Sequence, residues 1–252
     1  MNLRYNGTGI RIIPRLSLRY SRHTGEEGME MNDNRSAYNA CVYDEHIVNV
    51  LPYYGEYHKQ VIDLVKTMGL TAPDWLDTGC GTGTLCATAL ETLPNARFTL
   101  CDPSEKMLNE ARAKLKGKDV HFLNVPSGQL PFDAEFDVVT AIQSHHYCRP
   151  DERKQAVLGC YRALREGGVF VAFENIRMST DISDAIALKR WANFLAEHGN
   201  SGEDVQMHMD RRGVEIFPIT IGQHIALLRE CGFSSVNILW VSYLQAGFWA
   251  IR

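Results

Sequence analysis

The chain lacks any run of about eighteen consecutive apolar residues, so the sequence predicts no membrane-spanning helix. Its seven cysteines include no Cys-x-x-Cys pair, which argues against a zinc site and a redox-active dithiol, and we expect no metal site. No signal peptide, internal repeat or low-complexity linker is recognisable. The simplest expectation is a cytoplasmic protein with reduced thiols.

Acidic residues are absent from the first 25 residues, which hold five arginines. Subtracting these from the 26 basic residues leaves 21 basic against 30 acidic side chains in the rest, a balance of -9. Because such an acidic body repels phosphate backbones, we expect no nucleic-acid partner. The arginine-rich head is typical of a transit peptide and also of a disordered extension; we predict a disordered basic extension over residues 1–30.

Apolar residues follow a pattern that alternates between strand and helix along most of the chain. A helix over 54–68 precedes strands at 73–78, 97–101, 120–124, 136–143 and 168–175, with helices at 83–93, 104–116 and 151–164. Such alternation predicts βαβ units and a parallel sheet covered by helices on both faces. Ser104 is the expected N-cap of the helix at 104–116. The Gly-rich run 166–168 is expected to end the helix at 151–164.

The pattern changes after residue 175. Two helices, over 184–198 and 203–212, are expected to form an insertion at 176–218 over the carboxyl edge of the sheet. The chain then returns with a helix at 221–231 and strands at 235–240 and 245–251, whose short connection implies an antiparallel pair. We therefore predict a single domain over residues 31–252.

Three glycines follow a strand and open a helix in the run Asp77-x-Gly79-x-Gly81-x-Gly83. Glycine lets the backbone turn sharply and lets a ligand approach it, and the helix start presents free N–H groups to that ligand. Asp102 ends the next strand, nineteen residues after Gly83, where a carboxylate can accept both hydroxyls of a ribose. A tight turn without a ligand would not require this order of elements. The segment therefore predicts a site for an adenosine-containing ligand.

A dinucleotide is one candidate for that ligand, but the spacing disfavours it. Dinucleotide sites use Gly-x-Gly-x-x-Gly, whereas here the third glycine follows the second after a single residue. Asp77 at the strand end would repel a pyrophosphate and attract an ammonium group. S-adenosylmethionine carries such a group on its methionine part and is therefore favoured.

The glycine segment resembles the first motif of class I S-adenosylmethionine-dependent methyltransferases. Residues 100–108 resemble the family's ribose-binding motif, 136–146 its fourth-strand motif, and 164–170 the turn before its fifth strand. This resemblance implies a Rossmann-like, doubly wound α/β fold with a seven-stranded sheet. The sheet would be mostly parallel with an antiparallel last strand, and a helical insertion would follow strand 5. The resemblance also implies S-adenosylmethionine as the cofactor.

Residues 31–70 resemble the N-terminal lid helices of small-molecule members, with a weaker likeness to relatives that make carboxy-S-adenosylmethionine. Matched to the family motifs, the expected cofactor-binding residues are Tyr43, Asp77, Gly79, Cys80, Gly81, Gly83, Asp102, Pro103, Met107, Ser127 and Gln143. One segment departs from the family, because 124–131 contains no acid for the adenine amino group. Backbone groups near Ser127, or the Gln129 side chain, are expected to take that role.

Candidate catalytic residues follow the fourth and fifth predicted strands. In methyl transfer the donor is already activated, so the protein mainly aligns the reactants, and a base is needed only for a protonated acceptor. His145 and His146 are candidate bases because imidazole titrates near neutrality, although either can instead cap or pack. Glu174 ends an apolar strand, where it would act as a base, bind the acceptor, or form an ion pair with Arg177 or another basic side chain.

We therefore expect an enzyme that transfers the sulfonium methyl group of S-adenosylmethionine to a small-molecule acceptor by in-line displacement. Arg211 and Arg212 in the insertion suit an acidic acceptor, although such arginines commonly face solvent. Two alternatives stay open. The same site would also serve chemistry of the carboxy-S-adenosylmethionine type, or the chain would be a non-catalytic module that binds the cofactor.

Overall fold

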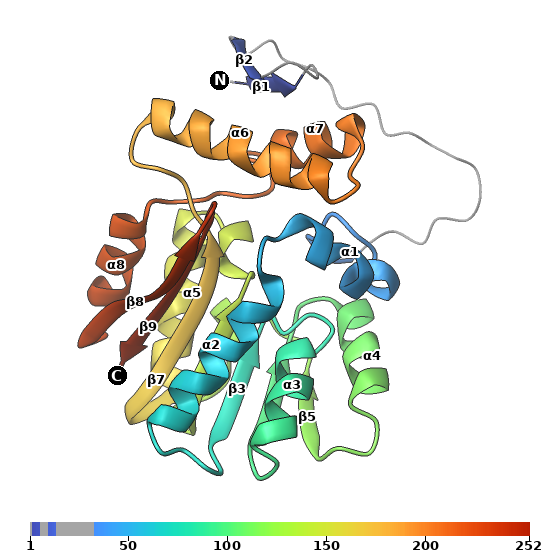
Figure 1. Ribbon diagram of the computed structural model, residues 1–252. Helices are drawn as coiled ribbons and strands as arrows, with labels where there is room; N and C mark the ends of the chain where they lie inside the picture. Colours follow the sequence, from blue (N-terminus) through green and yellow to red (C-terminus); the bar gives the residue numbers. More distant parts are fainter. Residues whose placement is uncertain (1, 6–9, 14–32) are drawn as a thin grey trace.

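The computed structural model describes residues 2–5, 10–13 and 33–252, in which a seven-stranded sheet lies between helical layers (Figure 1). Its strands are β3 (Asp74–Thr78), β4 (Arg97–Cys101), β5 (Val120–Leu123), β6 (Phe136–Ile142), β7 (Leu164–Asn175), β8 (Ser235–Ser242) and β9 (Gln245–Ile251). The order is β5-β4-β3-β6-β7-β9-β8, with β3 to β7 parallel and β9 antiparallel to both of its neighbours. The predicted mostly parallel sheet with an antiparallel last strand is confirmed.

Helices cover both faces of this sheet. One face carries α2 (Tyr54–Thr67), α3 (Thr84–Thr92) and α4 (Glu105–Lys114); the other carries α5 (Pro150–Ala163) and α8 (Ile221–Glu230). Because successive strand residues point to opposite faces, Trp75 packs into the first layer and Leu76 into the second. The central strands are therefore buried on both sides, which explains their nearly continuous apolar sequences.

The passage from α5 into β7 differs from the prediction. A helix stop at 166–168 and a strand from 168 are expected, whereas α5 ends at Ala163 and β7 begins at Leu164. Leu164 pairs with Phe136 of β6, and the Gly167 N–H donates to a backbone carbonyl at the C-terminus. Pairing with neighbouring segments therefore makes β7 begin four residues before the predicted start at residue 168. Gly167, with φ of 78°, allows the backbone to turn inside this strand.

The insertion after the fifth strand is present and consists of α6 (Asp181–Glu197) and α7 (Gly202–Asp210). Figure 1 shows both helices beyond the carboxyl ends of the strands. Helix α6 begins three residues earlier than predicted, because the Thr180 hydroxyl caps it by accepting a hydrogen bond from the Ser183 N–H. Among the described residues, no helix combines the length and the apolar character that crossing a bilayer requires.

The N-terminal part contributes elements that the sequence pattern does not place individually. Helix α1 (Tyr43–Val50) follows a short 3-10 turn and lies over the ends of α3 and α4 (Figure 1). Strands β1 (Asn2–Tyr5) and β2 (Ile10–Ile13) form an antiparallel pair beside α7. These two strands fall within residues 1–30, for which disorder is predicted; the remainder of that stretch lies outside the described residues.

Candidate active site

The glycine turn connects β3 to α3 at the carboxyl edge of the sheet. Gly79, Gly81 and Gly83 have φ values of 65°, 54° and 74°, which residues with a Cβ rarely adopt. A Cβ on Gly79 would lie 2.4 Å from the Ser144 Cβ, so this glycine lets the turn pack against the end of β6. A Cβ on Gly81 would meet no atom within 4 Å, which leaves that side of the backbone open to a ligand. Gly83 packs instead against Leu115, and its role is structural.

Asp102 follows β4 and contacts the glycine turn directly. Its Oδ2 accepts a hydrogen bond from the Gly81 N–H at 2.9 Å, and its Oδ1 accepts one from the Ser104 N–H at 2.9 Å. The turn and the acid therefore lie together, as the sequence predicts. The residue is 7% exposed, and burial raises its pKa to about 6.

Asp77 ends β3 beside the same turn and is more deeply buried. It is 2% exposed, and its Oδ1 accepts a hydrogen bond from the Thr140 hydroxyl at 2.7 Å. Burial raises its pKa to about 7, and the charge of Asp102 adds to this effect. Within the described part of the chain, no Lys or Arg contributes to the pKa shift of either carboxylate. Two buried carboxylates without a basic partner suit a cationic ligand.

Two tyrosines from the N-terminal helices close over these carboxylates. Tyr43 begins α1 and Tyr54 begins α2, and their hydroxyls interact electrostatically with each other. Tyr43 interacts with the charge of Asp102, and Tyr54 with that of Asp77. Burial raises the pKa of both hydroxyls, so both stay neutral at ordinary pH. Neutral aromatic rings next to carboxylates add cation–π attraction to the ion pairing.

Three further predicted cofactor residues flank the turn. The Cys80 N–H donates to the Cys101 carbonyl at 3.0 Å, which ties the turn to β4. Pro103 is exposed, whereas Met107 is buried in α4. The Met107 N–H donates to the hydroxyl of Ser104, which is the N-cap that the sequence predicts. Cys80 and Pro103 thus border the site, while Met107 mainly stabilises the helix.

The loop after β5, expected to contact an adenine, is held at the end of β3. The Ser127 hydroxyl lies 2.8 Å from that of Thr78. The Ser127 carbonyl also packs closely on α5, where a Cβ on Gly159 would come within 2.5 Å of it. Ser127 is half-buried and Gln129 is exposed, so Ser127 is the better placed of the two expected residues.

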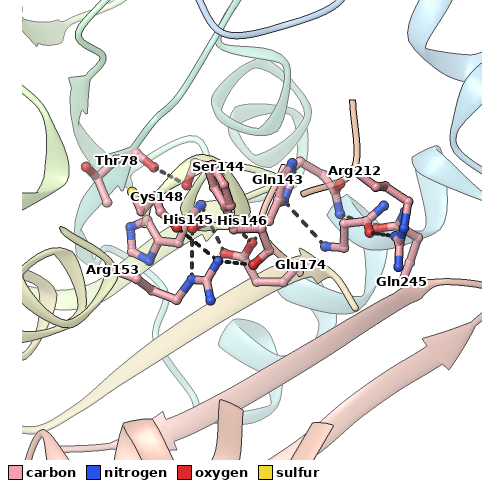
Figure 2. Close-up of polar contacts among 12 residues, drawn as sticks. Thr78, Gln143, Ser144, His145, His146, Cys148, Arg153, Glu174, Arg212 and Gln245 are labelled. Carbon is pink, nitrogen blue, oxygen red and sulfur yellow. Dashed lines mark hydrogen bonds and ion pairs between the residues drawn. The ribbon is translucent and has the colours of Figure 1, made fainter. Parts of the chain in front are cut away.

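Gln143 occupies the junction between β6 and the turn that follows it. Its φ of 54° is uncommon for a residue with a side chain and is typical of functional turns. Its side-chain amide donates to Gln245 Oε1 at 2.8 Å, across the sheet edge at the start of β9 (Figure 2). The amide predicted to meet the cofactor is therefore engaged with β9 in this structure.

Glu174 gathers the predicted catalytic residues into one cluster, drawn in Figure 2. Its Oε1 accepts from the His145 N–H at 3.2 Å; its Oε2 accepts from the His146 N–H at 2.8 Å and lies 3.0 Å from His146 Nδ1. Burial opposes ionisation of this carboxyl, but its interactions with His146 hold its pKa below the ordinary value. The alternative ion pair with Arg177 is absent, because Arg177 pairs with Asp181 at 3.1 Å.

The two adjacent histidines both contact Glu174 but differ in how their rings are used. His145 borders a small cavity between β7, α5 and α8 that Arg153 also lines, and burial lowers its pKa. Its Nε2 has no hydrogen-bond partner among the described residues. His146 instead directs its Nδ1 at Glu174. Of the two predicted bases, His146 is the one whose ring nitrogen lies within hydrogen-bond distance of a carboxylate that can orient it.

Two residues that the sequence analysis missed hold the site in place. Arg153 of α5 is 2% exposed, and its guanidinium donates to the carbonyls of His145, Cys148 and Phe217 at 3.0, 3.1 and 2.5 Å. Thr140 supplies the hydroxyl donor to Asp77. A signal existed for both. Arg153 lies one helical turn before the apolar residues 156–157 of α5, and Thr140 interrupts an otherwise apolar strand.

Arg212, in the segment after α7, reaches the carboxyl end of β7. Its Nη1 donates to Asn175 Oδ1 at 2.6 Å, and its Nη2 lies 3.4 Å from the Asp184 carboxylate. Its side chain is 10% exposed, and burial lowers its pKa despite the partial compensation by Asp184. Arg211 is paired more tightly, with Glu215 at 2.6 Å. Both predicted arginines are therefore paired with acids, and Arg212 also donates to the Ile176 carbonyl at 3.4 Å.

Known proteins resemble this chain over most of its length. A family model described as a methyltransferase domain matches residues 76–168. The carboxy-S-adenosyl-L-methionine synthase of Helicobacter hepaticus is 25% identical over 212 residues, covering 81% of this chain and 89% of the relative. The synthase of Campylobacter curvus is 27% identical over 204 residues, covering 78% and 84%. Magnesium protoporphyrin IX methyltransferase from Synechocystis PCC 6803, solved with bound SAH, matches with a TM-score of 0.58 at 15% identity, covering 81% and 85%.

Proposed function

We propose that this chain, which has the class I S-adenosylmethionine-dependent methyltransferase fold predicted from its sequence, is an enzyme that carboxylates S-adenosylmethionine. That compound is the cofactor expected for the fold. The similarity to carboxy-S-adenosyl-L-methionine synthases over 81% of the chain supports this reaction. We therefore prefer the alternative from the sequence analysis to the methyl transfer expected there.

The residues at the ends of β3 and β4 fit this cofactor. Asp102 would accept the ribose hydroxyls, and Asp77 would accept the ammonium group of the methionine part. The ring of Tyr43 would lie against the sulfonium. Open space next to Gly81 leaves room for the ligand at the backbone.

Carboxylation of the cofactor requires a second substrate that donates the carboxyl group, which methyl transfer does not require. A C–H bond of the cofactor methyl group is replaced by a C–C bond to a carboxyl carbon, while the donor acid loses that carboxyl and takes up the released proton. The donor is therefore an organic acid that decarboxylates readily, and its anionic group must be held beside the methyl group. We assign this role to Arg212. Its guanidinium lies at the carboxyl end of β7, bonded to Asn175 and 3.4 Å from Asp184, and a guanidinium can bind a carboxylate through two parallel hydrogen bonds.

His146 and the helical cover complete the proposed roles. Glu174 would orient the His146 ring through Nδ1, which leaves Nε2 as the nitrogen proposed to hold or move a proton during the reaction. Helices α1, α6 and α7 would exclude water, which would strengthen the ion pairs with the bound reactants.

Mass spectrometry of the reaction products tests the proposal. The purified protein is incubated with S-adenosylmethionine and a fractionated small-molecule extract rich in organic acids. A cofactor product heavier by the mass of one carbon dioxide is expected. Formation of S-adenosylhomocysteine with a methylated small molecule would replace the proposal with methyl transfer. Cofactor binding without any turnover would leave a non-catalytic module.

The Arg212→Met variant tests the role of the guanidinium. Turnover should fall by about 100-fold, whereas affinity for S-adenosylhomocysteine should change by less than about threefold, because Arg212 lies at the β7 end. Arg212→Lys keeps the charge without the planar fork and should recover only part of the activity. Arg229→Met, on the exposed surface of α8, is the matched control. Unchanged turnover in Arg212→Met, or loss of S-adenosylhomocysteine binding, would contradict this role.

A further inference from the structure

Lys114, the last residue of α4, joins three elements at the glycine turn. Its Nζ donates to Asp44 Oδ2 at 2.6 Å and to the hydroxyls of Thr82 and Thr84 at 2.9 and 2.7 Å. Asp44 Oδ1 accepts from the same two hydroxyls at 2.7 and 3.2 Å. Asp44 belongs to α1, Thr82 to the turn and Thr84 to the start of α3. Four side chains thus form a closed network between the lid helix and the cofactor turn.

The network holds the end of α1 that carries the lid tyrosine. Asp44 directly follows Tyr43, so a movement of this end displaces the tyrosine from Asp102. The opposite end of α1 is fixed separately, because Trp191 Nε1 of α6 donates to the Val50 carbonyl at 2.9 Å. Figure 1 shows α1 between the helices α6 and α7 on one side and the ends of α3 and α4 on the other. The Lys114 network and the Trp191 contact thus hold opposite ends of α1 separately.

Charge explains why the network needs both an acid and a base. The start of α3 is the positive end of a helix dipole, so the Lys114 ammonium is unfavourable there without an anion. Asp44 supplies that anion. Burial works against its ionisation, but hydrogen bonds from Lys114 and Thr82 hold its pKa below the ordinary value. The side chains of Lys114 and Asp44 are 27% and 44% exposed, so dissolved ions can screen the pair.

We propose that the Lys114–Asp44 pair is an electrostatic latch that holds α1 closed over the bound cofactor and sets the rate at which the cofactor leaves. Lys114 is a positioning residue in this role, acting through Asp44 and Tyr43. The inference rests on the cofactor site of the proposed function and is independent of carboxyl transfer. Partly exposed ion pairs change an equilibrium by up to about fivefold, which sets the size of the expected effect.

Stopped-flow measurement of S-adenosylhomocysteine dissociation from the full-length protein tests the latch. Lys114→Met should raise the dissociation rate about fivefold at low ionic strength and change the association rate by less than about twofold. Lys114→Arg keeps the charge and should restore most of the wild-type rate. Lys116→Met, on the exposed side of the same chain end, is the matched control and should behave as wild type.

Salt provides a readout that a purely structural role would not change. Raising the ionic strength to about 1 M should bring the wild-type dissociation rate towards that of Lys114→Met, whose own rate should respond less. Asp44→Asn, which keeps the side-chain shape, should repeat the effect if Lys114→Met loses its fold in thermal unfolding.

Several results would overturn the latch while leaving the proposed function intact. These are unchanged dissociation rates in both Lys114→Met and Asp44→Asn, an equal rise in Lys116→Met, or the same salt response in wild type and variants. Failure of the wild-type protein to bind S-adenosylhomocysteine would instead overturn the latch and the proposed function together.

Discussion

The carboxylates at the carboxyl edge of the sheet fall into two groups with different surroundings. Asp77 and Asp102 lie in one half of this edge, at β3 and β4, and Glu174 lies in the other half, at the end of β7. Asp77 and Asp102 accept hydrogen bonds only from hydroxyl and amide donors within the described residues, and burial raises both pKa values, to about 7 and about 6. Glu174 is equally buried, but two amides and the His146 ring surround it, and its pKa is lowered. Burial alone therefore does not identify a ligand-binding carboxylate. A carboxylate that contacts a basic side chain belongs to the architecture, whereas one that has only hydroxyl and amide donors is available to a cationic ligand.

Replacing the Glu174 side chain should have the largest effect on stability. A small effect would contradict the contrast between Glu174 and the two aspartates. Glu174→Ala should lower the free energy of unfolding by about 3–5 kcal/mol, because three buried donors lose their acceptor and a cavity remains. Glu166→Ala, on the exposed start of β7, should cost less than about 0.5 kcal/mol. Urea unfolding followed by circular dichroism measures both. A loss below about 1 kcal/mol in Glu174→Ala would mean that its donors are not structural.

Replacing Asp77, in the half of the sheet edge at β3 and β4, should weaken cofactor binding without lowering the free energy of unfolding. At pH 8, Asp77→Asn should lower cofactor affinity by about 30-fold while leaving the free energy of unfolding of the unliganded protein equal or higher. The reason is that the variant removes a buried charge that has no cationic partner. Calorimetric titration with S-adenosylhomocysteine and urea unfolding separate the two effects. A destabilised variant with normal affinity would place Asp77 in the same structural class as Glu174.

The pH dependence of binding sharpens the same point. With raised pKa values, the unliganded fold retains protons that the unfolded chain has lost; this contribution to stability is present at low pH and disappears as the pH rises towards 7. A cationic ligand needs the ionised form, so affinity should rise up to about tenfold per pH unit until the pH passes about 7. The pKa of His58 is lowered to about 4 by burial, so this residue stays neutral here. Asp77→Asn should flatten the profile; an equally steep profile would locate the proton elsewhere.

The predictable part of the site is the part encoded by neighbouring residues. The glycine turn, Asp102 and the N-cap at Ser104 follow from local order along the chain, because strand, turn and helix are consecutive there. The mostly parallel sheet with its antiparallel last strand follows from the strand–helix alternation and from the resemblance to the family, whereas the order of the strands was not predicted. The expected cofactor contacts themselves stay predictions.

Side-chain directions after the strands were not predictable in the same way. His145 and His146 are adjacent in sequence, yet the His145 ring borders a cavity lined by α5 and α8, while the His146 ring directs its Nδ1 at Glu174. Arg153 reaches the Phe217 carbonyl, and Arg212 the Asn175 amide, from segments that are distant in the sequence. Such contacts depend on how helices pack on the sheet, and a periodicity pattern does not contain that information.

Removing the Thr140 hydroxyl is the smallest change that tests whether ionisation of Asp77 controls cofactor binding. Its hydroxyl donates to Asp77 at 2.7 Å and accepts from Trp75 Nε1 at 3.0 Å. Thr140→Val should raise the Asp77 pKa further, move the affinity profile to higher pH and weaken binding at pH 7 by about threefold. Thr140→Ser keeps the hydroxyl and should match wild type, and urea unfolding measures the separate cost of leaving Trp75 unpaired. If the pH profile of cofactor affinity is unchanged in Thr140→Val, ionisation of Asp77 does not govern binding. Asp102 alone would then distinguish this half of the sheet edge from the half that contains Glu174.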